Sequence, residues 1–366
     1  MNHKFSKLIL LPIIFGILAG MLSGSIVYTY LFSYMNMGEI MLGAKWAKQV
    51  VSLPRLIDKE TKRAIFSSLV TFYRVKPTIQ SVADNIYLES DRLGYGFIIT
   101  SDGWVMASDN ILGRDFSRIA VVTNDGRTFS IKKIENDTRS GAVFVRLEAT
   151  NLSPIAFGNP RDLTFGEDLY LFDNLGKTTK VSFRGLGYES QTTKTSLFMS
   201  SEKFEKFLFF EEEVDSDFGG APLLNHRGEV VGIAKDIGTR ETDRAISFNH
   251  AYASMQNLFK TGDVPKLFLG IQYIDLSHVI SSESNLATRG ALISTGAGGV
   301  GVLRYSPAWD AELKEGDIVL RVGLDELNEE YSLSERIVEY HAGDIVDFTI
   351  LRDGEEKTVK VELGEL

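Results

Sequence analysis

The hydrophobic pattern changes along the chain, and its first part is an uninterrupted apolar run. Between Lys7 and Glu39 no charged side chain appears, and Leu, Ile, Phe and Val dominate. A helix needs about 20 apolar residues to span a bilayer, and the lysines at Lys4 and Lys7 favour a cytoplasmic N-terminus. We therefore expect an uncleaved signal anchor in residues 1–38, with the rest of the chain on the extracytoplasmic side of the cytoplasmic membrane. A cleaved signal peptide is the alternative.

Helical spacing follows the apolar run in residues 39–75. Apolar side chains recur at helical intervals in Gly43–Leu53 and in Ile57–Tyr73, and Pro54 separates the two segments. We expect a stalk of two short helices. Their apolar faces also offer a contact for oligomer formation.

From about residue 77 the period becomes that of β-strands. Short apolar runs separated by polar, glycine-containing turns indicate a sandwich or a barrel. A helix is then expected at His250–Thr261, ending at Gly262. The hairpins expected from this pattern are Tyr95–Thr100 with Trp104–Ala107, Ile119–Thr123 with Thr128–Ile134, and Pro222–Leu224 with Glu229–Ile233.

Composition and charge narrow the class of protein. The 366 residues are 44% hydrophobic and 24% charged, which is an ordinary globular composition. A formal net charge of -10 argues against nucleic-acid binding, which needs a basic surface. The chain has no cysteine, which excludes disulfides, thiolate zinc sites and a thiol nucleophile. The acidic run Glu211–Asp217 matches no calcium-loop spacing, so a solvated acidic loop is favoured over a metal site, and no motif indicates a cofactor.

The third expected hairpin follows a glycine-rich loop of the kind that displays a nucleophile in β-barrel enzymes. The loop reads Asp-Phe-Gly-Gly-Ala-Pro-Leu over Asp217–Leu223. It resembles the Gly-Asn-Ser-Gly-Gly-Pro-Leu stretch of the trypsin-like HtrA/Deg proteases. Aligned on the proline, the family's nucleophilic serine falls on Gly219, and aligned on the paired glycines it falls on Phe218. Neither side chain can attack a carbonyl group.

The other two catalytic positions of that family are also occupied by different residues. Residues 94–111 resemble the family's first hairpin, and the resemblance places Asn110 at the general-base histidine. Residues 137–144 resemble the segment of the orienting aspartate, and they place Ser140 at or beside it. Serine hydrolysis needs a nucleophile, a base and an orienting acid, and the resemblance leaves all three roles vacant. We therefore expect no peptidase activity by the family mechanism.

The C-terminal part resembles the PDZ domain that follows the protease domain in HtrA proteins. The resemblance rests on Phe268–Ile271, Ser306–Ala308, Leu313–Val319 and Gly343–Val346. A PDZ domain adds an extended peptide to a sheet edge and holds its terminal carboxylate with backbone N–H groups. The resemblance implies that Leu269, Gly270 and Ile271 form that carboxylate loop, and that a helix at Ser332–Tyr340 walls the groove and contributes Ile337 to its pocket. The alternative is that Leu269 and Ile271 only pack in the core.

The expected fold class is therefore mainly β: an N-terminal transmembrane helix, a trypsin-like double six-stranded β-barrel, and a PDZ domain. The expected parts are a cytoplasmic tip and anchor (1–38), a helical stalk (39–75), a trypsin-like pseudoprotease domain (76–262) and a PDZ domain (263–366).

The expected function is that of a membrane-anchored, proteolytically inactive scaffold or sensor that binds peptide or protein C-termini. One alternative is an active serine endopeptidase whose site is displaced or completed by a partner. The other is a regulatory subunit of an active HtrA paralogue. The resemblance implies a homotrimer, and the second alternative implies a hetero-oligomer.

Overall fold

The structure is a computed structural model, and its described residues are 20–21, 57–75, 86–112, 116–174, 176–188, 194–235, 241–264, 266–280, 287–295 and 299–366. The chain divides into two compact units, Met1–Arg55 and Leu56–Leu366. The anchor expected in residues 1–38 lies outside the described residues, apart from two positions, and so does the stalk helix expected at Gly43–Leu53. Within the described ranges, no helix combines the length and the apolar character that a membrane span requires.

The second unit begins with a helix and a sheet. Helix α2 (Lys59–Ser68) starts at Asp58, whose carboxylate accepts a hydrogen bond of 2.8 Å from the Thr61 N–H. The sheet has the order β5-β4-β1-β2-β3-β7-β6, with every neighbouring pair antiparallel. Its strands are β1 (Leu69–Arg74), β2 (Arg92–Ile98), β3 (Trp104–Ser108), β4 (Ile119–Thr123), β5 (Thr128–Phe129), β6 (Ile131–Asp137) and β7 (Ala142–Leu147).

Strand β1 corrects the expectation of a helix from Ile57 to Tyr73. The helix ends at Ser68, and Leu69–Arg74 lies between β2 and β4. Successive side chains from Leu69 to Phe72 are buried, so this segment is covered on both faces. Its β-branched and aromatic residues suit such a strand better than an amphipathic helix. The sheet therefore includes residues that the expected boundary at 76 assigned to the stalk.

The first and third expected hairpins are confirmed by the pairing of β2 with β3 and of β12 with β13. The second hairpin is only partly correct. Its outer arm is divided at Ser130, so that β5 pairs with β4 while β6 pairs with β7. This division gives the first sheet seven strands instead of the six expected.

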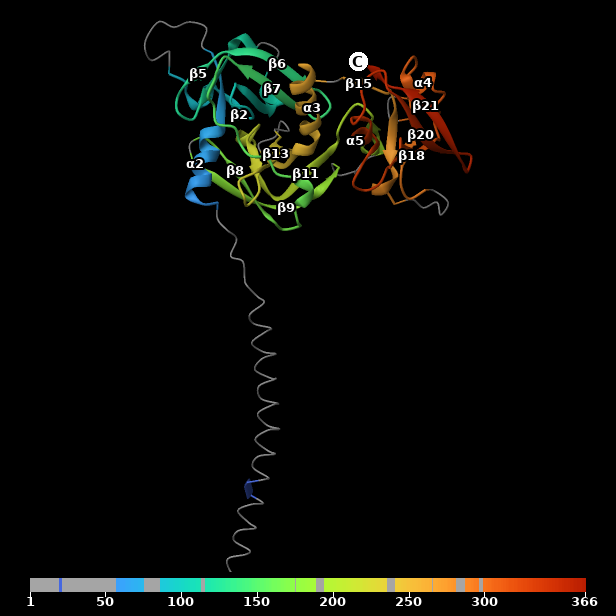
Figure 1. The fold of residues 1–366 in the computed structure, drawn as a ribbon, viewed down its shortest axis with the longest axis horizontal. Helices are drawn as coiled ribbons and strands as arrows, with labels where there is room; N and C mark the ends of the chain where they lie inside the picture. Colours follow the sequence, from blue (N-terminus) through green and yellow to red (C-terminus); the bar gives the residue numbers. More distant parts are fainter. Residues whose placement is uncertain are drawn as a thin grey trace, which may run out of the picture. The chain divides into compact units, whose positions relative to one another are not determined.

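The second sheet is a closed barrel of six strands in the order β11-β14-β13-β12-β8-β9. Helix α3 (Phe248–Thr261) follows it, as expected, and ends at Gly262 in the left-handed conformation. The Phe248 ring stacks on Phe157 with the ring centres 4.5 Å apart, which ties α3 to the core shared by both sheets. Figure 1 shows α3 running beside the strands of the two sheets. The barrel strands are β8 (Asp168–Phe172), β9 (Thr178–Tyr188), β11 (Lys206–Asp215), β12 (Pro222–Leu224), β13 (Val230–Ala234) and β14 (Glu241–Ser247).

The C-terminal module, residues 266–366, is a further sheet with two short helices. The strand order of this sheet is β10-β16-β17-β18-β20-β21, with β19 paired to β18. Its first strand, β10, comes from an earlier part of the chain, and β15 and β22 form a separate pair. Helix α5 is shorter than the expected Ser332–Tyr340, because the Val338 N–H turns back to the Arg336 carbonyl. The elements are β10 (Met199–Ser200), β15 (Leu267–Phe268), β16 (Gln272–Asp275), β17 (Ala291–Ile293), α4 (Pro307–Asp310), β18 (Ile318–Val322), β19 (Asp325–Glu326), α5 (Leu333–Ile337), β20 (Ile345–Arg352), β21 (Glu355–Glu362) and β22 (Gly364–Glu365).

We predict that Gly220→Ala destabilises the protein far more than Gly126→Ala. Both glycines have positive φ, 78° and 82°, so both substitutions carry a backbone penalty of about 1–2 kcal/mol. A Cβ at Gly220 would lie 2.1 Å from the Tyr95 carbonyl oxygen, whereas a Cβ at Gly126 meets nothing within 4 Å. Urea denaturation should give an additional loss of about 2 kcal/mol or more for Gly220→Ala. Equal losses would contradict the packing described for this loop.

Candidate functional site

The three positions that the resemblance assigns to catalytic residues lie on three loops of the two sheets. Asn110 lies on the 3-10 turn η3 (Asp109–Ile111), directly after β3. Ser140 lies in the turn between β6 and β7. Phe218 ends the 3-10 turn η7 (Ser216–Phe218), and Gly219 follows it before β12.

The structure brings these loops together. The Asp109 N–H donates to the Gly141 carbonyl at 2.9 Å, which joins η3 to the turn that holds Ser140. The Tyr95 N–H donates to the Gly219 carbonyl, also at 2.9 Å, which joins β2 to the glycine loop. A Cβ at Gly220 would also come within 2.1 Å of the Ile111 side chain, so the glycine loop lies directly against η3. The expected positions therefore converge even though their residues differ from the family's.

The side chains at the base and acid positions do not form a proton-transfer pair. Asn110 is exposed and carries an amide, which cannot accept and return a proton near neutral pH. Ser140 is buried, and its hydroxyl donates to the Asp137 carboxylate at 2.6 Å and accepts from the Ala142 N–H at 3.1 Å. The Asp137 carboxylate also accepts from the Ser254 hydroxyl of α3 at 2.7 Å. Ser140 is thus part of a network that holds its own turn against α3.

At the expected nucleophile position, a phenylalanine ring packs in the interior of the domain. The Phe218 ring is 3% exposed and lies in the hydrophobic core of the closed barrel, with the Lys177 ammonium group 5.2 Å from the ring centre. Gly219 has no side chain. A cavity of about 450 Å³ lies nearby, lined by Asp109, Ser140 and part of the segment 196–205.

Side chains and backbone groups from other parts of the chain bind carboxylates of the acidic run before this loop. The Glu212 carboxylate accepts from the N–H and the hydroxyl of Ser182 at 2.6 and 3.0 Å. The Asp217 carboxylate lies 3.1 Å from the Arg92 guanidinium. Throughout the described ranges, no cluster of three or more His, Cys, Asp or Glu side chains is arranged to hold a metal ion.

The residues expected to form the peptide groove have two roles. The side chains of Leu269, Ile271 and Ile337 are at most 1% exposed and belong to the core of the C-terminal module. The backbone N–H groups of Leu269 and Gly270 point instead to the Glu202 carboxylate, at 3.0 and 2.9 Å. Core packing of the side chains and carboxylate binding by the backbone therefore occur in the same loop.

A buried arginine connects the turn of Ser140 with the C-terminal module. Arg139 is 4% exposed, and its guanidinium donates to the carbonyls of Leu267 (3.3 Å), Ser201 (3.2 Å) and Ser334 (3.2 Å). The guanidinium also lies over the Phe204 ring, 5.3 Å from its centre. Arg139 thus contacts β15, the segment after β10, and α5.

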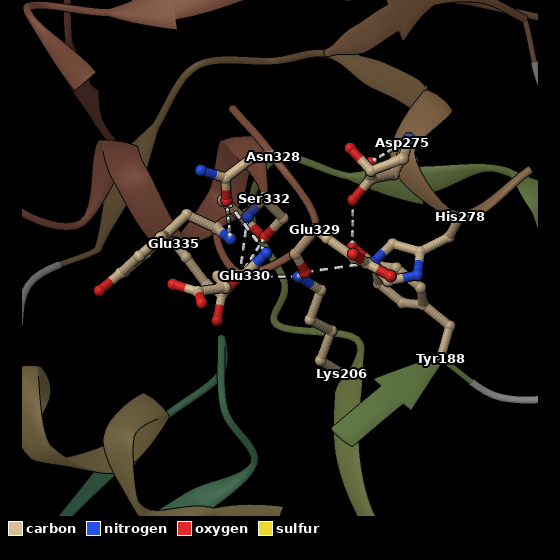
Figure 2. Close-up of polar contacts among 12 residues, drawn as sticks. Tyr188, Lys206, Asp275, His278, Asn328, Glu329, Glu330, Ser332 and Glu335 are labelled. Carbon is tan, nitrogen blue, oxygen red and sulfur yellow. Dashed lines mark hydrogen bonds and ion pairs between the residues drawn. The ribbon is translucent and has the colours of Figure 1, made fainter. Parts of the chain in front are cut away.

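A second buried contact joins α5 to the closed barrel. Figure 2 shows Lys206 of β11 beside Glu335, with its ammonium 3.5 Å from the carboxylate and 2.8 Å from the Glu329 carbonyl. The His250 ring nitrogen lies 3.0 Å from the other carboxylate oxygen of Glu335. Burial would raise the pKa of Glu335, but the hydrogen bond and charge of His250 and the charge of Lys206 outweigh it and hold that pKa well below its ordinary value.

Sequence reasoning missed Arg139, Glu202, Lys206 and Glu335, and it placed His250 only as the start of a helix. Glu202 lies 67 positions before Leu269, and His250 lies 85 positions before Glu335. No local motif connects residues this far apart, and only the folded arrangement brings them together.

Comparison with known proteins agrees with this architecture. Residues 94–233 match the trypsin-like peptidase domain, and residues 268–363 match the PDZ domain. The chain thus carries a trypsin-like peptidase domain followed by a PDZ domain. It belongs to the HtrA-type proteins, which combine these two domains.

The curated relatives are named as serine endoproteases. The chain is 30% identical over 279 residues to a probable periplasmic serine endoprotease DegP-like from Marinomonas sp. (strain MWYL1), covering 74% of this chain and 56% of the relative. It is 29% identical over 282 residues to the periplasmic pH-dependent serine endoprotease DegQ of Escherichia coli (strain K12), covering 74% and 59%. The chain therefore spans little more than half the length of these relatives.

Solved structures share the fold. The HtrA-type protease AlgW with decapeptide has a TM-score of 0.62 at 18% identity, covering 84% of this chain and 98% of that one. The serine endoprotease from Yersinia pestis has a TM-score of 0.54 at 19% identity, covering 85% and 99%.

We predict that Glu335→Gln changes how the free energy of unfolding depends on pH. Because the folded-state pKa of Glu335 lies below its ordinary value of 4.5, its contribution is complete above that value and is lost as the pH falls below it. At neutral pH the variant should be less stable by about 3–5 kcal/mol, since the buried ammonium group of Lys206 loses its counter-charge. Urea denaturation at a series of pH values should show the gap narrowing in acid.

The matched control is Glu326→Gln, which removes an exposed carboxylate of the same module that pairs with Arg289 at 2.8 Å. Its effect should stay within about 1 kcal/mol. If the difference in the free energy of unfolding between the wild type and Glu335→Gln stays constant in acid, the result contradicts the buried contact.

Proposed function

We propose that this protein is a membrane-anchored HtrA-like pseudoprotease that binds the C-termini of peptides or proteins through its PDZ domain, outside the cytoplasmic membrane. The trypsin-like domain then serves as a scaffold, and the PDZ domain serves as the recognition module. The observation that carries the proposal is the set of side chains on the three converging loops. Asn110 has an amide, and the hydroxyl of Ser140 is hydrogen-bonded to Asp137. Phe218 has a buried phenyl ring, and Gly219 has no side chain.

Loss of hydrolysis follows from the chemistry of these groups. In a well-studied serine protease, removing the triad lowers the rate by about 10⁶. The hydroxyl of Ser140 cannot substitute for the missing nucleophile, because it is buried and bonded to Asp137 within its own turn. The alternative function is that of an active endopeptidase, as the names of the relatives suggest. A hydrolysis assay on the purified protein distinguishes an active endopeptidase from a pseudoprotease.

Peptide binding is supported by the carboxylate loop. The N–H groups of Leu269 and Gly270 already donate hydrogen bonds to one carboxylate, that of Glu202. Two converging backbone N–H groups are the means by which a PDZ domain holds a peptide's terminal carboxylate. A solved HtrA-type relative of the same fold was determined with a decapeptide.

The proposed location combines the relatives' names with the sequence. Those relatives are named as periplasmic proteins, and the uncharged run between Lys7 and Glu39 is long enough for an anchor. An anchor confines the protein to a surface and raises its local concentration, which favours a homotrimer or a hetero-oligomer with an active paralogue. Co-purification with such a paralogue would distinguish a regulatory subunit from a scaffold that acts alone.

We predict that the purified protein does not hydrolyse casein. The comparison is a triple variant, Asn110→His, Ser140→Asp and Gly219→Ser, with Gly219→Ser alone and the E. coli DegQ protease as controls. Gly219→Ser alone should be as inactive as the wild type, because it still lacks a base. Activity in the triple variant would indicate that the loops keep the spacing of a triad.

The proposal fails if wild-type protein cleaves casein and the activity follows the protein through a second purification. In that case a displaced catalytic site has to be sought.

A further inference from the structure

A strand that precedes β11 in the barrel completes the sheet of the PDZ domain. Strand β10 (Met199–Ser200) pairs antiparallel with β16, with Met199 opposite Tyr273 and Ser200 opposite Gln272. Without β10, β16 would be the edge of its sheet. This is the edge to which a PDZ domain adds its peptide ligand, because β16 directly follows the carboxylate loop.

Glu202, two residues after β10, places its carboxylate in the carboxylate loop. One oxygen of Glu202 accepts from the N–H groups of Leu269 and Gly270 and from the Ser201 hydroxyl, at 3.0, 2.9 and 2.7 Å. The other oxygen accepts from the Ser200 hydroxyl at 2.9 Å. Hydrogen bonds to an ionised acceptor are stronger than those between neutral groups. A Glu side chain thus takes the place of a peptide's terminal carboxylate.

The segment also follows the register of a bound peptide. The Ser201 N–H donates to the Ile271 carbonyl at 3.0 Å, which continues the ladder to the end of the groove. Side chains alternate along a strand, and Met199 and Ser201 are 2% and 0% exposed while Ser200 is partly exposed. Met199 packs in the core of the PDZ domain, although it belongs to a different part of the chain. The Arg139 guanidinium also binds this segment, because it donates a hydrogen bond to the Ser201 carbonyl.

We infer that Met199–Glu202 is an internal ligand of the PDZ groove, and that an external peptide binds only by exchanging with it. The inference rests on the proposed function, since it takes this groove to be the peptide site. The external ligand is a peptide with a free C-terminal carboxylate. Its last residue takes the place of Ser201, and its third residue from the end, which is apolar, takes the place of Met199.

The same segment connects the groove with the vacated catalytic loops. Met199 and Phe204 line the cavity beside Asp109 and Ser140. On the other side, Ser200 and Glu202 line a smaller cavity of about 160 Å³ at the mouth of the groove, together with Leu303. Exchange of the segment for a peptide therefore changes the wall of the cavity in the trypsin-like domain as well as the contents of the groove.

An internal competitor lowers the apparent affinity for a peptide. The apparent dissociation constant is the intrinsic one divided by the fraction of molecules whose groove is free, and a tethered ligand acts at a high effective concentration. Removal of the Glu202 carboxylate deprives the segment of the two hydrogen bonds that it accepts from the N–H groups of Leu269 and Gly270 in the groove. We therefore expect Glu202→Ala to bind a C-terminal peptide at least tenfold more tightly than the wild type.

The probe is a fluorescent peptide with the segment's own sequence, Ser-Leu-Phe-Met-Ser-Ser (residues 196–201), ending in a free carboxylate. Its binding to the full-length wild type and to Glu202→Ala is measured by fluorescence anisotropy. Glu148→Gln is the control for loss of an exposed carboxylate outside the groove and should bind like the wild type. The same peptide with an amidated C-terminus should bind to none of the three proteins.

Hydrogen exchange on the wild type gives a test that needs no variant. At saturating peptide, the N–H of Ser201 should lose protection while β16 stays protected. Retained protection of Ser201 in the peptide-bound protein would overturn the inference.

The outcomes separate this inference from the proposed function. Equal affinity of wild type and Glu202→Ala for the carboxylate peptide overturns the internal ligand and leaves the peptide site in place. If Glu202→Ala does not bind the probe but binds other members of a C-terminal peptide array, only the internal ligand is overturned. If it binds no member of the array, the proposed peptide-binding function fails as well.

Discussion

The arrangement of both candidate sites depends on the buried guanidinium of Arg139. A guanidinium keeps its charge in proteins, so it must be surrounded by acceptors when it leaves water. Here the carbonyls of Leu267, Ser201 and Ser334, from three separate segments of the chain, accept hydrogen bonds from its two terminal nitrogens, whereas its Nε is buried without a hydrogen-bond partner. None of the three can move away without leaving a buried donor unpaired, which is costly. A single side chain in the turn of Ser140 therefore holds the start of the PDZ domain, the segment in its groove and helix α5 together.

The side chains at two of the expected catalytic positions take part in the packing and hydrogen bonding of the trypsin-like domain. Phe218 contributes a large buried ring to the closed barrel, and Ser140 contributes a hydroxyl to the Asp137 network that reaches Ser254 of α3. Replacing a buried ring with a small side chain costs several kcal/mol, typically about 3–5. Both side chains therefore contribute to the stability of these loops.

Sequence reasoning was most successful where the signal was local. Paired strands with glycine turns, helix α3 and the succession of trypsin-like and PDZ domains follow from periods and motifs that lie within a few residues of one another. It was wrong for Leu69–Arg74, because helical spacing in a short apolar run does not exclude a strand buried on both faces. The motif predicted a carboxylate-binding role for Leu269 and Gly270, which stays a prediction, but it did not indicate their contact with Glu202. A Met-Ser-Ser-Glu segment has no strand signal of its own, and its pairing with β16 depends on the tertiary fold.

The pairing of β10 with β16 has a consequence for solubility. A sheet edge exposes unpaired N–H and C=O groups, which are a template for association with another chain. In this protein the edge of the PDZ sheet is covered by the molecule itself. A PDZ domain without a resident strand offers a bare edge whenever it has no ligand. Here β10 pairs with β16 in the chain's own fold, so β16 does not present a bare edge for association with another chain.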